Sequence, residues 1–181
     1  MRKYWKVSRV TKKKILRLFR WTVENIKPVP KGLPVVDDHP LNIIIRGYGA
    51  EDQQAEVLAL LASYAGYPTG VQRIKLEGGS AELRITLTKM GHRLFVFDVA
   101  RKILYQNTSG HLIDLQHLRS DQRLIQATVG EIKIEGHRYE RFLQAIDENK
   151  ISFYRMQMQN PWSRLKMALF TTSDLSSSPA H

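Results

Sequence analysis

The 181-residue sequence contains no cysteine. This absence excludes disulfide bonds, thiolate metal ligands and a cysteine nucleophile. The sequence also lacks any apolar run close to the roughly 20 residues that a membrane-spanning helix requires. Basic residues interrupt the apolar positions near its start, so we recognise no signal peptide. We therefore expect a cytoplasmic protein, with peripheral contact to a membrane through its amino-terminal arm as a further option.

Acidic residues are missing from the first twenty positions, although the same segment holds nine of the 28 Lys and Arg residues in a chain of formal net charge +11. These are Arg2, Lys3, Lys6, Arg9, Lys12, Lys13, Lys14, Arg17 and Arg20, of which the last five are candidates for binding an anionic partner. Such a block can attract phosphates, an anionic polysaccharide or an anionic membrane surface. A solvated helix face explains the block equally well. No nucleic-acid recognition motif occurs, so nucleic acid is not an expected partner.

The pattern of apolar residues predicts a single α+β domain over residues 12–170, between a basic arm (1–11) and a polar, disordered tail (171–181). Thr11 is a suitable N-cap for a first helix, and a buried helix follows a Gly-Tyr-Gly break. Residues 42–45 fit either a strand or a helical turn. The predicted helices are 12–26, 51–65, 112–118, 138–146 and 162–170, and the predicted strands are 71–76, 82–88, 94–98, 103–105, 132–134 and 151–158.

One segment carries a resemblance to a known family. It reads Arg-Gly-Tyr-Gly-Ala-Glu-Asp-Gln-Gln-Ala over residues 46–55, and the buried helix that follows ends in Gly-Tyr-Pro at 66–68. This arrangement resembles the transglutaminase-like superfamily, whose fold is papain-like. In that family a glycine-containing turn delivers a nucleophilic cysteine to the first turn of the core helix. A histidine opens one following strand and an aspartate ends the next, so that the helix end, base and carboxylate together activate the thiol.

The resemblance implies a degenerate active site. Matching the family's alanine to Ala55 places the nucleophile position at Glu51, and the aspartate position falls at Asp98. The histidine position falls at Glu82, or at Ala81 if the hairpin is one residue shorter. The resemblance therefore implies a bacterial pseudoenzyme that binds or scaffolds a protein or polysaccharide partner, in the context of polysaccharide production. No cofactor is expected.

The substitutions themselves allow a second hypothesis. If the fold is as predicted, Glu51, Glu82 and Asp98 point into one cleft with Asp52 nearby. Such a cluster could hold a divalent cation through oxygen ligands. Alternatively, repulsion between the carboxylates could raise one pKa and create an acid–base pair for glycosidic bonds. Each residue also has a structural explanation: first-turn helix charge for Glu51, solvent exposure for Glu82, and a hydrogen-bonded turn for Asp98.

Overall fold

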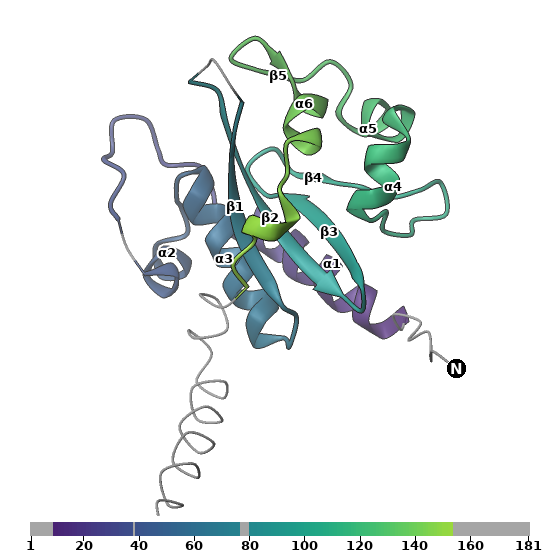
Figure 1. Cartoon of the computed structure of the whole chain (residues 1–181). Coiled ribbons are helices and arrows are strands. Elements are labelled where there is room, and N and C mark those ends of the chain that lie inside the picture. Colours follow the sequence, from purple (N-terminus) through teal and green to yellow (C-terminus); the bar gives the residue numbers. More distant parts are fainter. Residues whose placement is uncertain (1–8, 38, 77–79, 154–181) are drawn as a thin grey trace, which may run out of the picture.

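The computed structural model describes residues 9–37, 39–76 and 80–153, with side chains from residue 13 onward. It has a mixed α+β architecture built on a small antiparallel sheet, which confirms the predicted fold class at that level. The sheet has four strands in the order β1-β2-β3-β4, and helices cover both of its faces (Figure 1). No helix in the described residues is both long enough and apolar enough to cross a membrane.

The sheet is a meander, in which each strand pairs antiparallel with the next one along the chain. Its strands are β1 (Thr69–Lys75), β2 (Glu82–Met90), β3 (Arg93–Asp98) and β4 (Ile103–Leu104). In the register of the sheet, Thr86 of β2 lies opposite Val71 of β1 on one side and Phe97 of β3 on the other. The predicted strands 82–88 and 94–98 therefore correspond to β2 and β3.

One face of the sheet is covered by the amino-terminal helices. They are α1 (Arg9–Asn25), α2 (Pro40–Arg46) and α3 (Glu51–Tyr64). Ile15 and Phe19 of α1 pack with Leu58 of α3 against Phe97 of the sheet. α3 is buried on several sides, as its apolar pattern predicts, and carries α2 on its outer side. This arrangement places the amino terminus of α3 at the end of the sheet where β2 begins (Figure 1).

The opposite face is covered by the carboxyl-terminal half of the described chain. Its elements are α4 (Leu115–Ser120), α5 (Gln122–Val129), β5 (Lys133–Ile134), β6 (His137–Arg138), α6 (Tyr139–Gln144) and the 3-10 helix η1 (Glu148–Lys150). Phe142 and Ile146 lie in the same apolar core as Leu83 and Ile85 of β2. The Phe142 and Ile146 side chains are both buried.

Several boundaries differ from the predictions. α1 begins at Arg9, so Thr11 lies inside the helix rather than at its cap. The ambiguous segment 42–45 is helical because His39 caps α2 and Pro40 favours its first turn. α5 was not predicted, although Asp121 caps it. Residues 151–153 form no strand. The predicted helix 162–170, the rest of strand 151–158, the tail 171–181 and most of the arm 1–11 lie outside the described residues.

Candidate functional site

The turn before α3 is held in place by backbone contacts with the end of α1. The amide of Lys27 donates to the carbonyl of Gly47 (2.9 Å), and the amide of Gly49 donates to the carbonyl of Lys27 (2.9 Å). Gly47 adopts a positive φ of 76°, which favours glycine. A Cβ at Gly49 would lie only 3.0 Å from the side chains of Ile43 and Gln53. Both glycines of the Gly-Tyr-Gly motif therefore have structural reasons.

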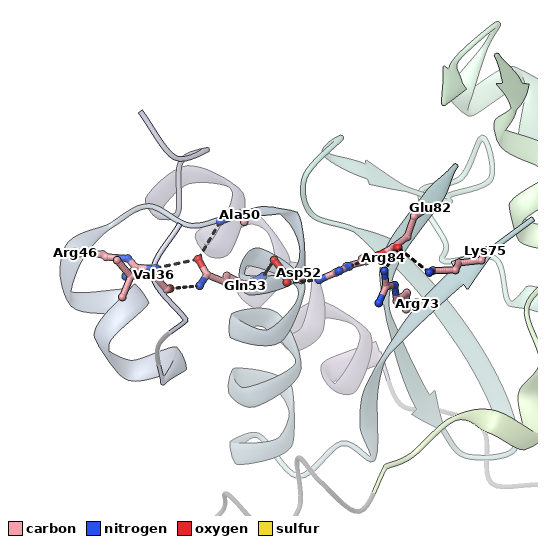
Figure 2. A network of polar contacts seen from close by, with 9 residues as sticks. All are labelled: Val36, Arg46, Ala50, Asp52, Gln53, Arg73, Lys75, Glu82 and Arg84. Carbon is pink, nitrogen blue, oxygen red and sulfur yellow. Dashed lines mark hydrogen bonds and ion pairs between the residues drawn. The ribbon is translucent and has the colours of Figure 1, made fainter. Parts of the chain in front are cut away.

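Gln53 fastens this turn to its surroundings (Figure 2). Its Oε1 accepts hydrogen bonds from the amide of Ala50 (3.1 Å) and from Arg46 Nη2 (2.9 Å). Its Nε2 donates to the carbonyl of Val36 (2.6 Å). The buried Gln54 donates to the carbonyl of Gly49 (2.9 Å). The two glutamines of the motif thus fix the loop around the helix terminus and face the protein rather than a ligand.

A shallow hollow of about 340 Å³ lies at this helix terminus. Its lining consists of Val35, Ala50, Glu51, Asp52, Glu82 and Arg84. Three of the four predicted carboxylates therefore share one hollow, drawn from the first turn of α3 and the first residues of β2. A cationic side chain lies among them.

Arg84 joins two of these carboxylates. It forms an ion pair with Asp52, and its Nε donates to Glu82 Oε1 (2.6 Å) (Figure 2). Glu82 also pairs with Arg73 of β1, while Lys75 Nζ lies 3.9 Å from its Oε2. Partial burial alone would raise the pKa of the Glu82 carboxyl, but the hydrogen bonds and charges of Arg73 and Arg84 bring that pKa below its ordinary value.

Arg101 joins the other two predicted carboxylates, Glu51 and Asp98. Its Nη2 lies 3.0 Å from Glu51 Oε1, and its Nη1 lies 3.3 Å from Asp98 Oδ2. Burial would lower the pKa of the Arg101 guanidinium, but Asp98 and Glu51 raise it above its ordinary value. The two positions that correspond to nucleophile and aspartate in the resemblance are therefore bridged by one cation.

Asp98 does not line the hollow. Thr86 faces α3, because its Oγ1 donates to the carbonyl of Ala55 (2.9 Å), and its cross-strand partner Phe97 faces the same way. Successive side chains of a strand point to opposite faces, so Asp98 points toward α6. There it is fully buried and accepts a hydrogen bond from the hydroxyl of Tyr139 (2.8 Å). Its Oδ1 also accepts from the amide of Arg101 (3.0 Å), as in the turn role considered above.

The expectation that Glu51, Glu82 and Asp98 point into one cleft therefore needs correction. Glu51 and Glu82 lie in the hollow, whereas Asp98 lies on the other face of the sheet and reaches Glu51 only through Arg101. The alternative histidine position, Ala81, is buried in the apolar core. Within the described residues, no group of three or more His, Cys, Asp or Glu side chains is placed to hold a metal ion.

The basic candidates lie on α1, and none of them lines this hollow. Lys13, Lys14, Arg17 and Arg20 are exposed on that helix, and Lys12 lies in it with a side chain outside the described set.

Sequence reasoning did not identify Arg73, Arg84, Arg101 and Gln53 as parts of the site. A weak signal existed for two of them. Arg84 is two residues from Glu82 on a strand, so the two side chains share a face. Arg101 follows Asp98 by three residues. In both cases the partner from α3 is visible only once the helix and the sheet are packed together.

Comparison with known proteins gives little further identification. No family model and no curated protein matches the chain. Among solved structures, the chain is similar to one described as "a Putative Cysteine Protease from Cytophaga hutchinsonii", with 14% sequence identity and a TM-score of 0.42. The similarity covers 56% of this chain and 34% of that protein, so the chain spans about a third of its length. These findings do not place the chain in a family.

Proposed function

We propose that this chain is a non-catalytic binding or scaffold protein with a transglutaminase-like arrangement of core helix and antiparallel strands. The proposal is supported by the absence of cysteine from the whole sequence. The observation that carries it is the bridge from Arg101 to both Glu51 and Asp98. The Arg101 guanidinium neutralises the two carboxylates by direct ion pairing, so no metal ion is needed to balance their charge.

The geometry of the hollow argues against acid–base chemistry on glycosidic bonds. A general acid needs a raised pKa so that it is protonated at working pH. The pKa of Glu82 is instead lowered by Arg73 and Arg84. Glu82 is therefore suited to remaining ionised as a member of an ion-pair network. The hollow is also poorly suited to a divalent cation, because the carboxylates of Asp52 and Glu51 are already paired with Arg84 and Arg101.

A thermal-shift experiment tests the proposal. Purified protein and the Glu51→Gln variant are compared with divalent cations, acidic and neutral oligosaccharides, nucleotides and short peptides. A ligand present at 100 times its dissociation constant stabilises the folded state by about 2.7 kcal/mol, which is readily measured. We expect no stabilisation that depends on Glu51. A rise in melting temperature that a divalent cation produces in the wild type and fails to produce in Glu51→Gln would overturn the proposal.

A further inference from the structure

The exposed side of α1 carries a line of cationic side chains. Lys13, Arg17 and Arg20 are separated by four and three residues, so they lie along one face of the helix. Lys14 and Trp21 flank this line on one side, and Trp21 is 39% exposed. We call these five residues the basic face of α1.

The opposite side of α1 is committed to the protein's own core. Ile15 is fully buried, Phe19 is 3% exposed, and both pack in the core beneath the sheet. α1 therefore cannot turn its apolar side toward a partner without losing these contacts. The side that remains available is the basic face.

Within residues 9–37, 39–76 and 80–153, the charges of the basic face have no ion-pair partner. Among the described residues, Lys13, Lys14, Arg17 and Arg20 form no ion pair, whereas Arg84 and its neighbours in the sheet are paired with carboxylates. Glu24, one turn beyond Arg20 on the same side of α1, is exposed and does not pair with it. Like charges at four-residue spacing oppose one another on a helix, so an anionic partner would relieve this repulsion.

We propose that the basic face of α1 binds an anionic lipid membrane surface. The face is the convex outside of a helix. The hollow beside α3 has no lining residue from α1, and neither has a second hollow, which lies beside α5. A convex line of cations can lie against a flat charged surface. Binding of a single-stranded nucleic acid or a sugar chain would call for a groove with several stacking aromatics, and this face offers only Trp21. Tryptophan beside cations is also typical of membrane–water interfaces.

Vesicle binding tests this proposal. The full chain is mixed with phosphatidylcholine vesicles that contain about 30% phosphatidylserine, an anionic lipid of the kind that attracts such cations, and with pure phosphatidylcholine vesicles. We expect binding to the anionic vesicles alone. Binding should be largely lost in about 0.5 M salt, where the screening length falls to a few ångströms.

Matched charge variants locate the contact. The triple variant Lys13→Glu, Arg17→Glu and Arg20→Glu should weaken vesicle binding on the order of a hundredfold, since each cation near the surface contributes appreciably. The control replaces Lys31, Arg123 and Lys133 by Glu, which changes the net charge equally at exposed positions elsewhere. The control should retain most of the binding. Equal losses in the two triple variants would overturn the proposal, because net charge rather than this face would then govern binding.

Trp21 supplies an independent reading. A variant with Trp5→Phe and Trp162→Phe leaves Trp21 as its only tryptophan, since the sequence has three. Its emission should shift to the blue with anionic vesicles and stay unchanged with neutral ones. An unshifted emission, or binding to a polyanion such as heparin or RNA without binding to vesicles, would reject a membrane partner.

Discussion

At the scale of single residues, arginine decides the character of the candidate site. Glu51 would be an exposed first-turn carboxylate and Asp98 a buried uncompensated charge if Arg101 did not connect them. Burying an unpaired carboxylate is costly, whereas a paired and hydrogen-bonded one is tolerated. Asp98 is fully buried and the Arg101 side chain is 20% exposed, so loss of the cation from this pair costs more stability than loss of the half-exposed pair with Glu51.

We predict that Arg101→Met lowers the free energy of unfolding by about 3 kcal/mol, because Asp98 is left as a buried charge without a cation. Glu51→Gln should cost less than about 1 kcal/mol, because it removes only a half-exposed ion pair. Urea denaturation measures both values.

The double variant Arg101→Met with Asp98→Asn is the control for this prediction. Removing the buried charge together with its cation should recover at least about 1 kcal/mol relative to the sum of the single changes. Strictly additive losses would show that Arg101 acts through packing and not through Asp98.

At the scale of secondary-structure elements, Gln53 connects three segments: the start of α3, the loop at Val36 and the end of α2 at Arg46. We predict that Gln53→Met removes the three hydrogen bonds that Gln53 forms with these segments and lowers the free energy of unfolding by about 1–3 kcal/mol. Hydrogen exchange should show faster exchange in residues 33–37 and at Ala50. Unchanged exchange there would mean that the loop is held by other contacts.

Gly70 marks the place where the chain after η1 crosses β1. A Cβ at Gly70 would lie 2.8 Å from the backbone oxygen of Ser152 and 3.3 Å from Ile151 Cγ2. We predict that Gly70→Ala lowers the free energy of unfolding by about 1–3 kcal/mol through overpacking. The exposed change Lys75→Ala in the same strand should cost less than about 0.5 kcal/mol. Equal effects of the two changes would show that Gly70 has room for a side chain.

Local patterns predicted most elements of the amino-terminal two thirds. α3 and the β2–β3 hairpin follow from a strong apolar pattern between clear glycine and proline breaks. α5 escaped prediction because it is eight residues long and buries only Ile125 and Val129. Short elements of this kind are stabilised by tertiary packing more than by their own sequence.

At the scale of the whole molecule, the sequence predicted that carboxylates gather at the end of α3 but not which groups neutralise them. The ion pairs of Arg84 with Asp52 and of Arg101 with Glu51 join residues that are far apart in the chain. The side on which Asp98 points depends on the register of β3, which a single sequence does not determine.

The dependence of stability on pH reflects two acidic groups whose pKa values are lowered in the folded state, Glu82 and Asp114. Burial would raise the pKa of both carboxyl groups. Hydrogen bonds from Arg73 and Arg84 instead lower the pKa of Glu82, and hydrogen bonds from His117 lower the pKa of Asp114. A pKa that is lower in the folded state stabilises the protein above the unfolded value and loses this contribution as the pH falls. We predict that the urea concentration at the midpoint of unfolding decreases as the pH is lowered from about 5 to about 3. Glu82→Gln should make this decrease smaller.

The ionisation of Glu82 tests the central claim most directly, namely that the hollow at α3 is an ion-pair network rather than an acid–base site. Carbon-detected NMR of the side-chain carboxyl, followed through a pH titration, gives its pKa. The account predicts a value below the ordinary glutamate pKa of about 4.3, rising when Arg84 is replaced by Met. A pKa near or above 6 in the wild type, in the range of catalytic acids, would contradict it.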